Sequence, residues 1–139
     1  MTEHYAYLCI GCPLGCRLEL DVDDQGGEPR FEVRGNSCKK GDDFARQEHV
    51  DPRRTVTTTV ACEGGRWPRL PVRTTATVPR DRVGEVCWAL RAVTVHSPVA
   101  MGDVVLADVC GTGADVVATR ALCGCHGGID RRGPPADTQ

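Results

Sequence analysis

The sequence predicts an α+β fold, and two observations support this class. Short runs in which apolar and charged residues alternate, as at Leu18, Leu20 and Val22, recur between turn residues and are typical of antiparallel strands. Apolar residues at Val83, Val86, Cys87 and Leu90 are spaced three and four apart, which is the pattern of one buried helix face. At 139 residues the chain is long enough for one average domain or for two small units that share a core.

The first elements are a hairpin and a short helix. Apolar and charged residues alternate from residue 17, an acidic and glycine-rich stretch at residues 23–27 makes the turn, and Phe31 and Val33 alternate on the return. Asp42 and Asp43 then favour the start of a short helix that ends before residue 52, which is a proline.

The remaining elements follow from residue 55 onward. A threonine- and valine-rich strand, a Gly-Gly turn and a second strand precede the helix that carries the buried face. A closing pair of strands comes after it, and the composition beyond residue 120 is rich in Gly, Pro, Asp and Arg, which predicts a flexible tail. The predicted strands and helix lie at residues 55–62, 70–74, 81–90, 104–106 and 116–118.

Four cysteines are distinguished by their spacing. Cys9, Cys12 and Cys16 fall within a stretch of eight residues, and Cys38 follows the predicted hairpin. Because a hairpin returns the chain to its starting point, we expect Cys38 to come back to the loop that holds the other three. Four thiolates in this arrangement can hold a Cys₄ iron–sulfur cluster. We call these residues the cysteine quartet, and residues 9–16 the cysteine loop.

A zinc ion is the alternative occupant of the cysteine quartet. Structural zinc sites are usually built from two C-x2-C pairs. Here one C-x2-C runs on into a third cysteine, and Cys38 stands alone. The spacing therefore favours a [4Fe–4S] cluster, with zinc as the open alternative.

The composition excludes several classes of function. The formal net charge is −2, so we expect no general attraction for nucleic acid and no nucleic-acid role. No apolar stretch approaches the length of a membrane span, and residues 1–10 lack the positive region of a secretory signal. We therefore expect a cytoplasmic protein with reduced thiols, in which nine cysteines, an odd number, favour metal or redox chemistry.

The first third of the chain resembles the [4Fe–4S] segment of molybdopterin oxidoreductases such as formate dehydrogenases and nitrate reductases. The resemblance rests on the spacing of the cysteine quartet and on Lys40-Gly41 after its last member. In that family the matching lysine lies between cluster and pterin on the electron path, so the resemblance implies a cofactor-binding role for Lys40. Those enzymes are several times longer than this chain, and a relict domain that binds pterin across two chains is a third interpretation.

Over residues 9–120 the chain also resembles a short family known as domain of unknown function 1667. Members of that family are encoded in anaerobes beside FAD-dependent dehydrogenases of the glycerol-3-phosphate type and a pyridine-nucleotide-type flavoprotein. The resemblance implies a small iron–sulfur subunit of a flavin dehydrogenase complex. The shared motifs include, in chain order, Cys-x2-Cys-Pro-x-Gly-Cys, Gly-Asn-x-Cys-x-x-Gly, Arg-x-x-Thr-x-Thr-Val, Pro-Val-x-Thr, Pro-Val-x-x-Gly-Asp-Val and Gly-x-Asp-Val-Val-Ala-Thr-Arg.

The other cysteines carry weaker signals. Cys62 and Cys87 lie on apolar faces and are expected to be small core residues. Cys123, Cys125 and His126 form a C-x-C-H cluster of a kind that binds metals or acts as a dithiol, but they lie in the predicted tail. The sequence contains no G-x-G-x-x-G, P-loop or G-x-S-x-G motif, and no catalytic residue is assigned.

We therefore expect an α+β protein with a small N-terminal iron–sulfur loop and hairpin unit at residues 1–50. This unit is expected to pack on a mixed strand–helix unit at residues 51–120, with a flexible tail at residues 121–139. The predicted function is electron transfer to or from a flavin-dependent dehydrogenase partner, without catalysis by the chain alone. The alternative is a zinc-stabilised adaptor with no redox role.

Overall fold

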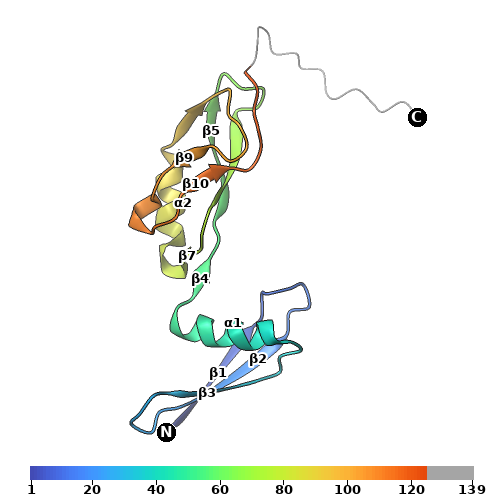
Figure 1. Ribbon diagram of the computed structural model, residues 1–139, viewed down its shortest axis with the longest axis vertical. Coiled ribbons are helices and arrows are strands. Elements are labelled where there is room, and N and C mark those ends of the chain that lie inside the picture. The colour runs from blue at the N-terminus through green and yellow to red at the C-terminus, as the bar shows by residue number, and fades with distance from the viewer. Residues whose placement is uncertain (125–139) are drawn as a thin grey trace, which may run out of the picture. The chain divides into compact units, whose positions relative to one another are not determined.

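The computed structural model describes residues 1–124 (Figure 1), and these form two compact units. The first unit is Met1–Arg53 and the second starts at Arg54. Each unit contains both strands and helix, which confirms the predicted α+β class as a mixed strand and helix architecture.

The first unit is a three-stranded antiparallel sheet with one helix. β2 and β3 form the predicted hairpin, in which Leu20 lies opposite Val33. The sequence did not predict β1, which pairs with β2 along its whole length, from Thr2 opposite Asp23 to Leu8 opposite Arg17. The elements are β1 (Thr2–Leu8), β2 (Arg17–Asp23), β3 (Arg30–Arg34) and α1 (Lys39–Val50), and the sheet order is β1-β2-β3.

The core of the first unit lies between the sheet and α1. Leu18 and Leu20 of β2 are fully buried, and Ala45 of α1 is buried with Leu18 in one cluster. Because successive side chains of a strand point to opposite faces, the charged residues of β2 lie on the other face of the sheet. The segment with the predicted alternation is thus a strand, β2, with one buried face and one exposed face.

Helix α1 begins earlier than the acidic pair at residues 42–43 suggested. It starts at Lys39, with Cys38 as its N-cap residue. A Cβ on Gly41 would lie only 2.8 Å from Asn36 Cβ and 3.4 Å from Leu18 Cδ2. The first turn can therefore approach β2 closely because position 41 has no side chain.

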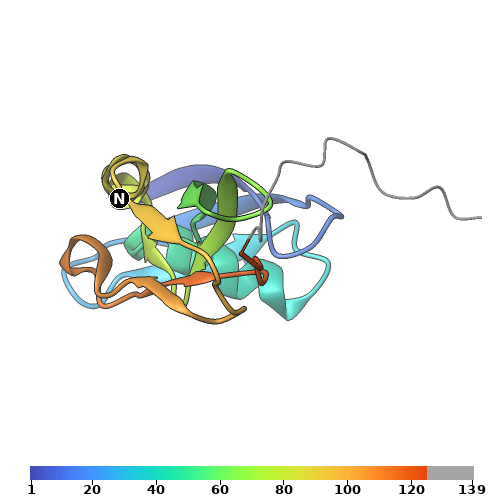
Figure 2. The ribbon, with the colours of Figure 1, turned by 90° about the horizontal axis from the view of Figure 1, so that it is seen from above.

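The second unit is a five-stranded sheet with helix α2 to one side (Figures 1 and 2). The strand order is β8-β5-β6-β10-β9, and only the β5–β8 pair is parallel among these strands. β8 was not predicted, because Thr94–His96 holds a single apolar residue, whereas the two predicted closing strands are equally short but are continuous apolar runs. The elements are β4 (Arg53–Arg54), β5 (Thr57–Glu63), β6 (Arg69–Thr74), β7 (Val78–Pro79), η1 (Arg80–Arg82), α2 (Val83–Arg91), β8 (Thr94–His96), β9 (Val104–Leu106), η2 (Val109–Gly111) and β10 (Val116–Ala118).

The core of the second unit combines side chains from its sheet and from α2. Val60 of β5 and Val86 of α2 are completely buried in one cluster. Cys62 is buried in the same cluster, which confirms the prediction that it is a core residue, whereas Cys87 is half-buried and packs against the cluster. The predicted helix face is thus the face that α2 buries.

The first residues of the predicted tail pair with the second unit. Leu122 is buried, and it exchanges two backbone hydrogen bonds of 2.9 Å with Val99. Gly124 forms a further bridge with Gly65. The rest of the predicted tail, which includes Cys125 and His126, lies outside the described residues. Within the described part of the chain, no helix has the length and apolar character that crossing a membrane requires.

Candidate functional site

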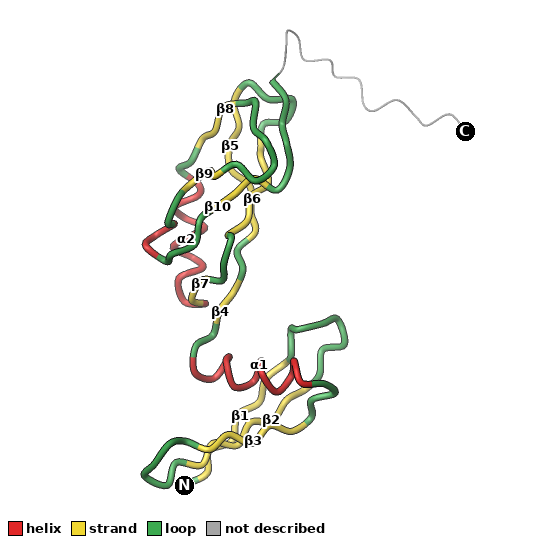
Figure 3. Tube along the Cα trace, in the orientation of Figure 1, coloured by secondary structure: helices red, strands yellow, loops and turns green. Residues whose placement is uncertain are grey.

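The cysteine loop connects β1 to β2 and lies beside the start of α1 (Figure 3). Its ends are joined by a hydrogen bond of 2.8 Å, which the backbone N–H of Cys9 donates to the carbonyl of Cys16. Gly15 adopts a φ of +64°, a conformation that glycine reaches without the steric cost of a Cβ. The loop is therefore closed at its base by the β1–β2 ladder.

Residues 35–38, which we call the lead-in loop, pass close to the start of β2 at Gly35 and end at Cys38. A Cβ on Gly35 would lie 2.2 Å from the carbonyl oxygen of Arg17, and the φ of Gly35 is +83°. No other residue can approach β2 so closely at this point. The side-chain amide of Asn36 donates a hydrogen bond of 3.2 Å to the carbonyl of Cys38, which fixes the last part of the loop.

The cysteine loop and the lead-in loop contact each other. Cys16 Sγ lies 3.3 Å from Ser37 Oγ, in a hydrogen bond between residues 21 positions apart. A Cβ on Gly11 would lie 3.6 Å from Cys9 Sγ and 3.7 Å from Lys40 Cβ. The hairpin thus returns the segment that carries the fourth cysteine to the loop that carries the other three.

The four thiols lie at one end of the first unit but are not gathered around one point. Cys9 is buried, Cys16 is half-buried, and Cys12 and Cys38 are exposed; all four are free thiols. In the part of the chain that the structure describes, no group of three or more Cys, His, Asp or Glu side chains is arranged to hold a metal ion. The quartet fits an iron–sulfur cluster or a zinc ion in its donor chemistry. Binding would require the four thiols to converge on one point.

The surroundings of Cys16 favour its thiolate. The side-chain hydrogen bond with Ser37 is the main cause that lowers the pKa of Cys16 below its usual value, and a backbone hydrogen bond at Ser37 adds to this effect. Both interactions stabilise the charged form of the sulfur. Since the thiolate is the form that binds metals, Cys16 is suited to be a ligand.

Exposed apolar side chains surround the cysteine loop. Leu8, Ile10 and Leu14 are 60%, 59% and 68% exposed, respectively. Lys39 and Lys40, on the first turn of α1, are exposed as well. The end of the unit that carries the quartet therefore presents apolar and positively charged groups to its surroundings.

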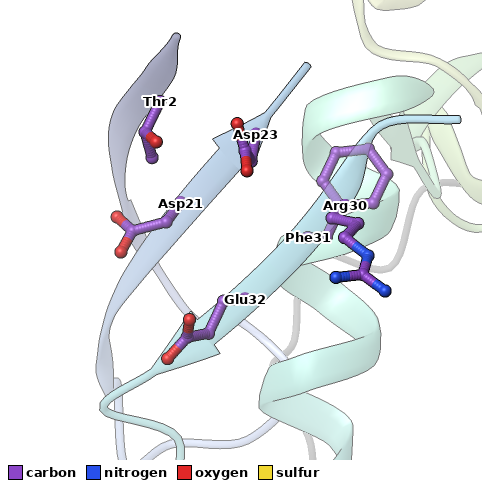
Figure 4. Close-up of a pocket in the computed structure, with 6 residues that line it drawn as sticks. All are labelled: Thr2, Asp21, Asp23, Arg30, Phe31 and Glu32. Atoms are coloured by element: carbon purple, nitrogen blue, oxygen red, sulfur yellow. The ribbon is translucent and has the colours of Figure 1, made fainter. Parts of the chain in front are cut away.

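A second feature of the first unit is a shallow cavity at the end of the sheet away from the cysteine loop (Figure 4). Its volume is about 460 Å³, and no member of the cysteine quartet lines it. Asp21, on its wall, pairs with His4 and Arg34. The cavity is lined by Thr2, Asp21, Asp23, Arg30, Phe31 and Glu32.

Sequence analysis missed the contacts that Ser37 and Tyr7 make. Ser37 was an unspecified position in the motif around Cys38, and its contact with Cys16 depends on the register of the hairpin. Tyr7 Oη lies 3.0 Å from His49 Nδ1, which joins β1 to α1. The available signal for β1 was the presence of Tyr5 and Tyr7 two residues apart, because aromatic residues are enriched in strands.

The fold and the cysteine geometry define a small two-unit α+β protein with a cysteine-rich loop. The chain belongs to the family described as "Protein of unknown function (DUF1667)", which it matches over residues 39–120. This confirms the expected family resemblance over that range. The match begins at the first residue of α1, so it includes Lys40, whereas the cysteine quartet precedes it.

One solved structure similar to this chain is the NMR structure of the Clostridium perfringens protein CPE0013, a structural genomics target. The two sequences are 20% identical, and the TM-score is 0.49. The similarity covers 59% of this chain and 98% of the other. No curated protein matches the chain.

Proposed function

We propose that this chain is an iron–sulfur electron-transfer subunit, in which the cysteine quartet holds a [4Fe–4S] cluster. The observation that carries the proposal is the contact of 3.3 Å between Cys16 and Ser37, because it sets the segment of the fourth cysteine against the cysteine loop. Four thiols with no carboxylate among them are the donor set of Cys₄ clusters.

The residues around the quartet would control its redox behaviour. When bound, such a cluster accepts and releases one electron at a time with little rearrangement. Gly11 and Gly15 have no side chain of their own to cover the backbone N–H groups of the cysteine loop, and such groups can donate hydrogen bonds to sulfur. The charges of Lys39 and Lys40 would stabilise the more negative, reduced state and so raise the midpoint potential.

The surface around the quartet suits contact with a redox partner. Cys12 and Cys38 are exposed, so the electron path to the surface is short. Exposed apolar side chains at Leu8, Ile10 and Leu14 resemble the apolar centre of a protein interface. Each transfer would move one electron between the partner and the quartet, and no covalent bond in this chain would form or break.

The identity of the partner is proposed from the sequence resemblances. They favour a FAD-dependent dehydrogenase, a pyridine-nucleotide-type flavoprotein, or both, as the electron donor or acceptor. Lys40 lies beside the cysteine loop, and the sequence resemblance matches it to the electron-path lysine of molybdopterin oxidoreductases.

Reduction by a flavin tests this function. The chain is reconstituted anaerobically with iron and sulfide, and it is mixed with photoreduced flavin mononucleotide in a stopped-flow spectrometer. We expect bleaching of the visible absorption by one electron per chain, since we propose one cluster per chain. Loading and bleaching are expected to be lost in Cys12→Ser and kept in Cys123→Ser, whose thiol is exposed but lies outside the quartet. A colourless protein that binds zinc through the quartet would instead support the adaptor.

A further inference from the structure

The Ser37 hydroxyl contacts one member of the cysteine quartet without belonging to the quartet itself. It is 3.3 Å from Cys16 Sγ, and Ser37 directly precedes Cys38 in the chain. When Cys16 is a thiolate, the sulfur carries no proton, so the hydroxyl is the donor of this hydrogen bond. A hydroxyl in this position acts on a cluster through the sulfur of its ligand.

The position of Ser37 is set by its neighbours and not by its own side chain. Gly35 presses against the carbonyl of Arg17, where any Cβ would come within 2.2 Å. Asn36 contacts the first turn of α1 at Gly41 and donates a hydrogen bond to the carbonyl of Cys38. Removing the hydroxyl is therefore expected to leave the path of the lead-in loop unchanged.

We propose that Ser37 is a positioning residue that raises the redox potential of the site through its hydrogen bond to the Cys16 sulfur. This inference rests on the proposed function, because it requires a cluster at the cysteine quartet. Reduction adds negative charge to the cluster and to its ligand sulfurs. A hydrogen bond to sulfur is then stronger in the reduced state, which favours reduction.

The effect of Ser37 on the redox potential is expected to depend on salt differently from the effect of Lys40. The exposed lysine acts through its charge, and at an ionic strength of 0.1 M such interactions are screened over about 10 Å. The hydroxyl acts through a direct contact, which salt does not screen. An effect of Ser37 is therefore expected to be the same at low and high salt, and an effect of Lys40 is expected to shrink.

The experiment compares midpoint potentials of the reconstituted wild-type chain, Ser37→Ala and Ser37→Thr, measured by protein-film voltammetry at low and high salt. In Ser37→Ala we expect the equilibrium constant for one-electron reduction to fall by roughly threefold to tenfold, where tenfold corresponds to about 59 mV. Ser37→Thr keeps a hydroxyl and is expected to retain the wild-type potential. Iron content and circular dichroism control for loading and folding.

The outcomes separate this inference from the proposed function. A wild-type chain that binds no iron would overturn both. Full iron loading with the same potential in wild type and Ser37→Ala would overturn the role of Ser37 and leave the electron-transfer proposal standing. Loss of iron in Ser37→Ala but not in Ser37→Thr would also overturn it, since the hydroxyl would then hold the site together and not adjust its potential.

Discussion

The Tyr7 hydroxyl lies 3.0 Å from His49 Nδ1 and so joins the edge strand of the first unit to the last turn of its helix. The His49 ring also lies 4.5 Å from the ring of Tyr5 and 5.7 Å from that of Phe31. Tyr7 stands two residues before Cys9, and the opposite end of α1 begins after Cys38. β1 and α1, which adjoin the two segments that carry the cysteine quartet, are thus tied to each other, and Tyr7 also packs against the cluster that contains Cys9.

The Tyr7–His49 contact is expected to stabilise the first unit measurably. Tyr7→Phe removes this hydrogen bond while keeping the ring, and we expect the free energy of unfolding to fall by about 1 kcal/mol. Urea unfolding followed by circular dichroism measures this loss. Tyr5→Phe is the matched control, because the Tyr5 hydroxyl donates to the exposed Glu3, and a change below about 0.5 kcal/mol is expected. Equal losses in both variants would contradict the role of the contact.

The close approach of Gly35 to β2 predicts a large effect of a single methyl group. Gly35→Ala would place Cβ 2.2 Å from the Arg17 carbonyl, and we expect a loss of more than about 2 kcal/mol in stability together with weaker iron loading. Gly26→Ala is the matched control, since Gly26 has nearly the same φ, +82° against +83°, but nothing within 4 Å of its Cβ position.

The comparison isolates steric contact from backbone strain. Gly26→Ala is expected to cost only the conformational penalty of a left-handed residue, about 1–2 kcal/mol. Thermal unfolding and iron analysis of both variants measure the difference. Similar stability and similar iron content in the two variants would show that the lead-in loop does not depend on its contact with Arg17.

The ion pairs on the outer face of the first sheet predict that the stability of the protein depends on pH. The hydrogen bond with His4 is the main cause that lowers the pKa of Asp21, and the charge of Arg34 adds to it. Since this pKa is lower in the folded state, the stabilisation is complete above the usual aspartate pKa of about 3.9 and is lost as the pH falls through the lower folded value.

Asp21→Asn is expected to remove this part of the pH dependence. Its unfolding midpoint in urea should lie below that of the wild type near neutral pH, and the two midpoints should converge as the solution is acidified below about pH 4. Urea titrations at a series of pH values measure this. A difference in urea midpoint that stays constant at every pH would contradict the lowered pKa of Asp21 as the source of the pH dependence.

Lys40 is expected to raise the midpoint potential of a bound cluster. Lys40→Glu replaces a positive charge beside the cysteine loop by a negative one and should lower the potential, because the reduced cluster is the more negative state. The shift should be largest at low ionic strength. Voltammetry at two salt concentrations measures it. An unchanged midpoint potential at low salt would show that the charge of Lys40 does not influence the cluster.

Much of the fold could be predicted from periodicity, and the failures have physical reasons. The β2–β3 hairpin and α2 each bury one regular face, so their patterns were readable. β1 is exposed along nearly its whole length, so it shows no apolar alternation of the kind that burial imposes. The start of α1 was misplaced because Cys38 is not a residue that usually caps a helix.

The candidate site was less accessible to sequence reasoning. The spacing of the cysteine quartet suggested its members and the return of Cys38 along the hairpin. Which thiols are buried depends on how the cysteine loop lies over α1, and no periodic pattern encodes this. The contact between Ser37 and Cys16 depends on the hairpin register and on the close approach at Gly35, both of which are tertiary features.

A redox-active iron–sulfur cluster in the cysteine quartet can be detected by metal and sulfide analysis of the anaerobically purified chain, combined with electron paramagnetic resonance before and after dithionite. We expect about four irons and four sulfides per chain and a paramagnetic signal that appears on one-electron reduction, both lost in Cys12→Ser. A chain with about one zinc, no sulfide and no signal after reduction would contradict the presence of such a cluster.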